Sequence, residues 1–299
     1  MSGLLEILEQ NGPLTGKEIS ARSGLDLLDA WKGCCGNPEI IVRTVGERYL
    51  RFDKRVEGYA RLSPSIIREF ASYTVAGLVR QASAVLARAE EIHQEILSVS
   101  RQKFLLARDI LSEIVAAQED SASIREHACF ILSGDVAHQM AHREPRPEFS
   151  SGKLVNGSDL DIVVLTDCLP DEQVQALDAA IFAKKVYLLR NPTYREEIDY
   201  VIKDLAKARA QLDFDGFEAM VASKVLDEGL FLCGSERLFG LVKDMITDKG
   251  IPGRLAELRE KAAAEREIAR AMLLETDGVL DDEEVMQLFF SSDEREEFF

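Results

Sequence analysis

The stretch that decides the fold is Asn156-Gly-Ser-Asp-Leu-Asp-Ile-Val-Val-Leu165. Its glycine and serine predict a tight turn, and the apolar run that follows predicts a strand. Asp159 and Asp161 lie two apart, so on a strand both side chains point to the same side. Two carboxylates held so close repel each other unless a cation lies between them. Oxygen ligands at this spacing suit Mg²⁺, which takes one or two carboxylates together with water and phosphate oxygens.

Two further segments carry strand patterns on either side of this stretch. Upstream, Ala128-Cys-Phe-Ile-Leu-Ser-Gly134 is an apolar run that ends in Ser-Gly. Downstream, Glu196-Glu-Ile-Asp-Tyr-Val-Ile202 places Asp199 between Ile198 and Tyr200. The sequence therefore predicts three strands, two of which carry carboxylates near their beginnings.

This order of motifs resembles the nucleotidyltransferase superfamily, the DNA polymerase β-like fold. Its pattern is a strand ending in Gly-Gly or Gly-Ser, a helix, Asp-x-Asp on the next strand and a third carboxylate on a later strand. The resemblance covers residues 122–245, by motif order rather than continuous identity. It implies transfer of a nucleoside monophosphate from an NTP to an acceptor, with release of pyrophosphate. Small molecules, RNA (such as tRNA) and proteins all remain open as acceptors.

The resemblance also implies roles for particular residues. Asp159, Asp161 and Asp199 would bind two Mg²⁺ or Mn²⁺ ions, and Asp199 would serve as or assist the base. Gly134 would let the backbone approach the phosphates. The remaining nucleotide contacts would come from Ser133, Ser158 and Lys224.

The chain departs from the family pattern in two places. Asp135 follows Gly134, where a carboxylate would repel phosphate unless a metal or a lysine offsets it. The gap between Gly134 and Asp159 is longer than in compact members and is closer to the aminoglycoside and lincosamide type. The alternative function is therefore a nucleotide-sensing or DNA-binding regulator with an inactive transferase-like domain.

Composition limits the compartment and the partners. The chain carries 36 Lys and Arg against 53 Asp and Glu, a net charge of −17. This balance argues against bulk non-specific affinity for nucleic acid. The odd number of cysteines, five, suits a reducing compartment. Because no signal peptide or apolar run of membrane length is present, we expect a cytoplasmic protein without a membrane partner.

Residues 1–62 resemble a winged helix-turn-helix module. Helices are predicted at residues 3–11, 16–23 and 26–35, and Thr15 with Glu18 predicts a capping box. Residues 40–45 and 48–52 predict a hairpin, the wing. The module would bind nucleic acid or pack against another protein surface or a dimer mate, and both interpretations stay open. Binding to phosphates would fall to Arg43, Arg48, Arg51 and Lys54.

The rest of the chain completes an α+β prediction. Residues 63–120 form a helical spacer, in which apolar or small residues recur at alternating steps of three and four from Val75 to Val99. This seam needs a second helix, either of the same chain or of a second copy in a homodimer. Residues 121–250 form the transferase-like mixed sheet flanked by helices. Residues 251–299 form a charged helix and an acidic tail, with Phe289-Phe290 and Phe298-Phe299 as docking points.

Overall fold

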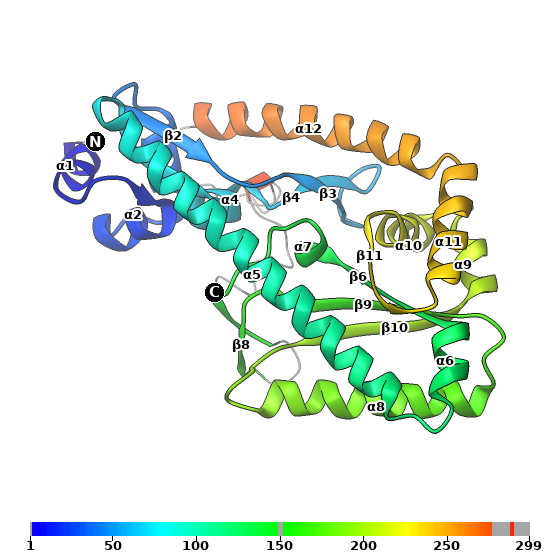
Figure 1. Cartoon of the computed structure of the whole chain (residues 1–299). Helices are drawn as coiled ribbons and strands as arrows, with labels where there is room; N and C mark the ends of the chain where they lie inside the picture. The colour runs from blue at the N-terminus through cyan, green and yellow to red at the C-terminus, as the bar shows by residue number, and fades with distance from the viewer. Residues whose placement is uncertain (1, 149–151, 277–287, 290–299) are drawn as a thin grey trace. The chain divides into compact units, whose positions relative to one another are not determined.

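The computed structural model describes residues 2–148, 152–276 and 288–289. Helices and several small sheets build an α+β fold, as predicted (Figure 1). The chain divides into two compact units. The N-terminal unit comprises residues 1–95 and 258–299, and the central unit comprises residues 96–257.

The N-terminal unit contains an antiparallel sheet in the strand order β1-β5-β2. Its elements are α1 (Ser2–Asn11), β1 (Leu14–Thr15), α2 (Gly16–Ser23), α3 (Leu27–Cys35), β2 (Ile40–Thr44), α4 (Ile66–Tyr73) and β5 (Thr74–Leu78), with a short 3₁₀ turn at Val79–Gln81. The capping box of α2 is confirmed. The Thr15 hydroxyl accepts a hydrogen bond from the Glu18 backbone N–H, and the Glu18 carboxylate accepts one from the Thr15 N–H.

The predicted hairpin between residues 40–45 and 48–52 is wrong. β2 pairs with β5, in register from Ile40 with Leu78 to Thr44 with Thr74. The strand after β2, β3 (Tyr49–Phe52), pairs with β4 (Ala60–Ser63) instead. The physical reason lies in β5, whose five residues are all buried. A buried strand must satisfy its backbone groups on both edges, so β5 takes β1 on one side and β2 on the other.

C-terminal residues complete the N-terminal unit. The last helix, α12 (Ile251–Glu275), brings Arg266 and Arg270 to the buried Glu69, with shortest N–O distances of 3.0 and 3.3 Å. Phe289 is buried, and its ring centroid lies 5.6 Å from that of Trp31. Docking at Phe289 is therefore confirmed. The predicted acidic tail and the other docking points, Phe290, Phe298 and Phe299, lie outside the described residues.

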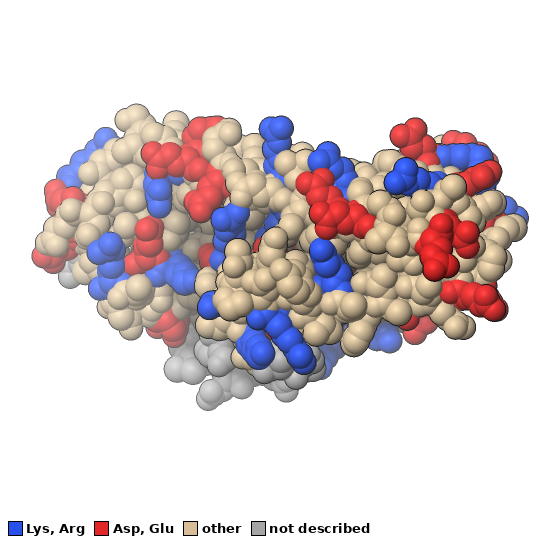
Figure 2. Space-filling view, turned by 60° about the horizontal axis from the view of Figure 1, so that its bottom comes forward, with Lys and Arg blue, Asp and Glu red and all other residues tan. Residues whose placement is uncertain are grey.

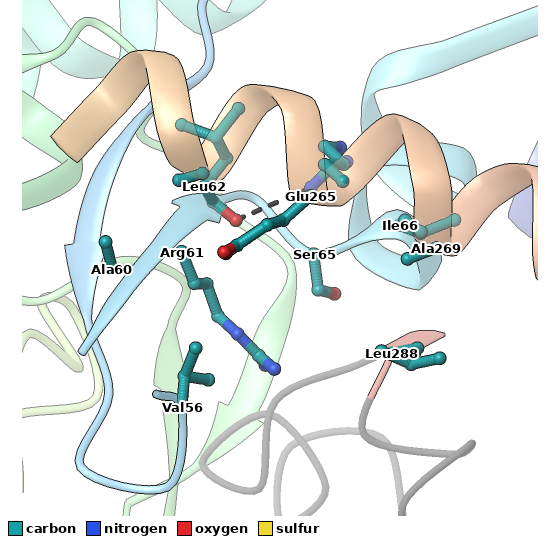
Figure 3. A pocket seen from close by; sticks show the side chains of 11 residues that line it. Val56, Ala60, Arg61, Leu62, Ser65, Ile66, Glu265, Ala269 and Leu288 are labelled. Carbon is teal, nitrogen blue, oxygen red and sulfur yellow. Dashed lines mark hydrogen bonds between the residues drawn. The ribbon is translucent and has the colours of Figure 1, made fainter. Parts of the chain in front are cut away.

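The N-terminal unit also holds a cavity of about 130 Å³. It lies among β4, the start of α4 and α12, and Figure 3 shows Arg61 extending into it toward Leu288. Apolar side chains form most of its wall, including Val56, Ile66 and Ala269. This cavity shares no residue with the candidate site described below.

The central unit is built on a four-stranded mixed sheet in the order β10-β9-β6-β11. Its strands are β6 (Ala128–Ser133), β9 (Leu160–Thr166), β10 (Ile198–Asp204) and β11 (Leu230–Gly234). β9 runs parallel to β10 and antiparallel to β6, which is antiparallel to β11. All three strands predicted from the sequence are confirmed within two residues at their ends. A two-stranded ribbon, β7 (Pro145–Pro147) with β8 (Leu154–Asn156), lies between β6 and β9 in the chain.

Helices cover both faces of this sheet. Residues of α5 (Ala82–Ala116) and α8 (Asp171–Arg190) share a core with Leu132 and Ile162 on one face. On the other face, Gly229 packs against Ile131, and Gln211 accepts a hydrogen bond from Lys203. The helices on that side are α9 (Leu205–Gln211), α10 (Phe217–Glu228) and α11 (Glu236–Asp248), and the short α6 (Ser121–His127) and α7 (Gly134–Ala137) flank β6 (Figure 1).

From Ala82 to Val99 the predicted seam lies on one continuous helix, α5, of 35 residues. Its first two members, Val75 and Leu78, lie on β5 instead, so the predicted helical start of the seam is wrong. From Val85 on, its members are already buried in the single chain; Val85, Ile92 and Val99 are 0, 7 and 5% exposed. The seam is therefore occupied by this chain's own packing and is not available for a second copy. A homodimer through another surface stays a prediction. No described helix is long and apolar enough to span a membrane.

Candidate functional site

The sheet register brings the predicted carboxylates together. Asp161, the second residue of β9, pairs with Asp199 of the parallel β10. On the other side of β9, Asp161 pairs with Ser133, the last residue of β6. Paired residues on neighbouring strands project to the same face. Asp161 and Asp199 therefore share the sheet face that α9 and α10 cover further along the strands.

Gly134 makes room for Asp161. Its backbone has a positive φ of 70°, and a Cβ at this position would lie 2.0 Å from Asp161 Oδ2. No side chain fits there without displacing the carboxylate. The glycine thus allows close backbone approach, but to a carboxylate of the chain itself.

Asp159 lies at the entrance to β9 and is partly covered. Its side chain is 33% exposed, and its Oδ2 lies 3.6 Å from Arg146 Nη2. Burial raises the pKa of Asp159, the Arg146 guanidinium lowers it, and the nearby carboxylates of Asp135 and Asp199 raise it further. The balance is a raised pKa, as expected where carboxylates crowd with too few cations.

Asp135 belongs to this group of carboxylates. Ser158 donates a hydrogen bond from its hydroxyl to Asp135 Oδ2 at 2.8 Å and accepts one from the His142 N–H at 3.2 Å. Ser158 is buried, so its hydroxyl holds the turn before Asp159 in place. The residue that departs from the family pattern is therefore part of the site. Together, Asp135, Asp159, Asp161, Glu197 and Asp199 are called the acidic cluster below.

Two cations reach the acidic cluster. Arg146, on β7, places Nη2 2.9 Å from Glu197 Oε2 and donates from Nε to the Gly157 carbonyl. Lys185, on α8, places Nζ 2.8 Å from Asp199 Oδ1. Neither Glu197 nor Lys185 is predicted as a site residue from the sequence. The signal that could have found Glu197 is its position within the predicted strand at residues 196–202, two residues before Asp199 and so on the same face.

A buried lysine ties the two ends of the site together. Lys103, on α5, donates to the Asn156 carbonyl at 2.9 Å and to the Glu196 carboxylate. Burial lowers the pKa of Lys103, and Glu196 partly restores it. Asn156 precedes Asp159, and Glu196 precedes Asp199, so one ammonium group anchors both segments.

Lys224, predicted to contact the nucleotide, lies on α10 with a partner of its own. Its Nζ is 2.5 Å from Glu228 Oε2, and the same carboxylate is 2.8 Å from His138 Nε2. Burial raises the pKa of Glu228, but the hydrogen bond from His138 and the charge of Lys224 outweigh it, and the net shift is downward. The trio links α10 to His138, the residue that follows α7.

The donor set suits a cation bound by few protein ligands. Among the described residues, no three His, Cys, Asp or Glu side chains form a ready metal-ligand cluster. The register supplies the pair Asp161 and Asp199, with Asp159 at the entrance. Mg²⁺ accepts this kind of site, because it is commonly held by one or two carboxylates and completes its shell with water and substrate phosphates.

The basic residues predicted to bind nucleic acid have varied surroundings. Arg43 is exposed on β2, whereas Arg48 is bound to the buried Glu69, which raises the pKa of Arg48. Arg51 is partly buried, and Lys54 is exposed in the turn after β3; both interact with other parts of the chain.

The second helix of the predicted helix-turn-helix, α3, is largely covered. Of the nine residues of α3, only Asp29 is exposed. Lys32 donates to the Thr276 carbonyl at 2.8 Å, and Arg270 lies over the ring of Trp31. α3 therefore exposes little surface with which it could enter a groove of DNA.

Comparison with known proteins adds no relative. No family model matches the chain, and no curated protein matches it at significant similarity. The geometry of the acidic cluster is therefore the main guide to function.

Proposed function

We propose that the chain is a metal-dependent nucleotidyltransferase, which moves a nucleoside monophosphate from an NTP to an acceptor. The observation that supports this most is the strand register, which aligns Asp161 with Asp199 beside the Gly134 turn. Carboxylates from two strands, a glycine turn and nearby cations are parts that recur in sites of phosphoryl transfer.

Each residue would have a distinct task. Asp159, Asp161 and Asp199 would hold Mg²⁺, which neutralises charge on the phosphates when bound. Asp199, the most exposed of the three, would face the acceptor hydroxyl and take its proton. Arg146, held by Glu197 and the Gly157 carbonyl, would meet the phosphate charge at the entrance.

The test is label transfer from a panel of NTPs in Mg²⁺, with total cell extract as the source of acceptor. We expect one labelled fraction with the wild-type chain and none with Asp161→Asn. Absence of labelling with every NTP, together with no stabilisation of the chain by Mg²⁺ and NTP, would overturn the proposal.

A second candidate is a regulator that senses a nucleotide without turning it over. It is favoured by Asp135, whose carboxylate lies at the turn where phosphates would bind, and by Arg146 and Lys185, which already neutralise part of the cluster. This function predicts binding of Mg²⁺ and NTP with no pyrophosphate release. Pyrophosphate production in the presence of extract separates the two candidates.

A further inference from the structure

One segment beside the acidic cluster has a composition unlike the rest of the chain. Residues 184–195 read Lys-Lys-Val-Tyr-Leu-Leu-Arg-Asn-Pro-Thr-Tyr-Arg. They contain four basic residues, two tyrosines and no acidic residue, within a chain of net charge −17. The segment covers the end of α8 and the loop into β10, and is called the basic-aromatic segment below. Figure 2 shows basic and acidic side chains interspersed over the face in view, so the sign of the surface charge changes over short distances.

The two tyrosines form an exposed aromatic pair. The rings of Tyr187 and Tyr194 have centroids 6.1 Å apart at an interplanar angle of 54°. The two residues are 50 and 36% exposed. Asn191 donates a hydrogen bond from its amide to the Tyr187 hydroxyl at 2.9 Å, which fixes one ring. Aromatic rings that are both exposed and held in place are suited to stacking.

One cation of the segment lies over this pair, and two others are exposed. Lys184 Nζ lies 5.7 Å from the centroid of the Tyr187 ring. Arg190 and Arg195 are exposed, and no ion pair is seen for either within the described residues. These guanidinium groups are therefore accessible to an anionic ligand.

The segment is fixed directly to the acidic cluster. Lys185 binds Asp199, and the Asn156 side chain donates to the Tyr194 carbonyl at 2.7 Å. The Asn156 N–H also donates to the Arg195 carbonyl at 2.8 Å. Asn156 starts the turn that leads to Asp159. A ligand on the basic-aromatic segment would thus lie at the entrance to the candidate site.

We propose that the basic-aromatic segment binds single-stranded nucleic acid and that this strand is the acceptor. The acceptor role rests on the proposed transferase function; the binding does not. Charge alone would also suit an acidic protein. The exposed tyrosine pair favours nucleic acid, because bases stack on aromatic rings while phosphates bind lysine and arginine.

The test is fluorescence anisotropy with a labelled single-stranded RNA of mixed sequence, at low salt, in EDTA and without nucleotide. Tyr187→Ala/Tyr194→Ala should weaken binding about fivefold or more, the lower end of the stacking range. Its matched control is Phe182→Ala, which removes an exposed ring (58%) from the same helix and should leave affinity unchanged.

Charge reversal gives an independent readout. Arg190→Glu/Arg195→Glu should lower the slope of log Kd against log salt by about 1.4, since each phosphate contact contributes about 0.7 on a single strand. Lys207→Glu/Arg209→Glu, with the same charge change on exposed positions of α9, should keep the wild-type slope. A thermal melt of each variant confirms folding before its affinity is interpreted.

Three results would overturn the proposal: no RNA binding by the wild type, equal weakening by the α9 control, or equal binding of a poly-glutamate peptide that is insensitive to loss of the tyrosines. Failure of the transferase function is a separate result. RNA binding without label transfer would keep the surface and remove the acceptor role. Label transfer to a small molecule without RNA binding would keep the transferase function and remove both the RNA surface and its acceptor role.

Discussion

A side chain at Gly134 would occupy the space of the Asp161 carboxylate. Gly134→Ala should lower the free energy of unfolding by about 1–3 kcal/mol, from the left-handed backbone and the collision together. It should also abolish stabilisation by Mg²⁺ and NTP. Gly250→Ala is the matched control, with φ of 66° and open space around its Cβ. Denaturant unfolding should show a backbone cost in both variants but loss of ligand response only in Gly134→Ala.

The raised pKa of Asp159 has a consequence for stability. Burial comes first among its causes, opposed by Arg146 and reinforced by Asp135 and Asp199. Because the folded chain holds this proton more tightly than the unfolded chain, stability falls as pH rises from the ordinary value of 3.8 through the raised pKa. Above the raised pKa, the contribution of this proton to the free energy of unfolding is lost completely.

Asp159→Asn should therefore be more stable than the wild type at neutral pH in EDTA, and the difference should shrink as pH falls through the window. Denaturant unfolding of both proteins from pH 4 to 8 measures this difference directly. A variant that is less stable than the wild type at pH 7 would show that Asp159 is held by favourable contacts and is not electrostatically strained.

At the scale of single residues, the sequence predicts the carboxylates better than the cations. Asp159 and Asp161 lie two apart on a predicted strand, so they are expected on one face. Asp199 lies in a second strand pattern, and parallel pairing of the two strands is enough to align it with them. Arg146 and Lys185 come from a ribbon and a helix, whose approach depends on tertiary packing. No local period carries that information.

Among the elements, α5 is joined to the site loops by one buried ion pair. Lys103 and Glu196 are 3 and 12% exposed. Lys103→Met should cost about 3–5 kcal/mol, because it leaves a carboxylate buried without its partner. Lys103→Met/Glu196→Gln should recover much of that loss. Lys184→Met is the surface control, since its partner Glu113 is 71% exposed, and should change stability by less than about 1 kcal/mol.

Urea unfolding of this series of variants also tests how α5 is attached to the site loops. If the double variant is no more stable than Lys103→Met, the lysine acts through the Asn156 carbonyl rather than through Glu196.

Local patterns predicted elements but not all of their partners. The capping box at Thr15 is a local interaction, and the helix it begins is confirmed. β2 carries a clear strand pattern, yet its partner β5 lies about thirty residues away, beyond a glycine turn that suggested a nearer one. The seam likewise predicts α5 from Ala82 onward, although its first two positions form β5. Whether the seam packs against its own chain or against a second copy depends on the whole fold.

For the whole molecule, the C-terminal end matters to the N-terminal unit. Phe289 is 1% exposed against Trp31, so Phe289→Ala should lower the free energy of unfolding by about 3–5 kcal/mol. Ile268→Ala on α12, where the side chain is 68% exposed, should change it by less than about 0.5 kcal/mol. Tryptophan fluorescence reports unfolding around this contact directly, because Trp31 is the single tryptophan. Equal stability of the two variants would mean that the Phe289 contact contributes nothing.

The central claim is that the acidic cluster is a site for Mg²⁺ and a nucleoside triphosphate. The most direct test is thermal unfolding of the wild type and Asp161→Asn, each with and without both ligands. The wild type should melt about 5 °C higher at ligand concentrations near a hundred times Kd. Asp161→Asn should show no ligand shift, with stability in EDTA equal to or above that of the wild type. A variant that is clearly destabilised in EDTA and keeps the full ligand shift would make Asp161 a structural residue and contradict the proposed function.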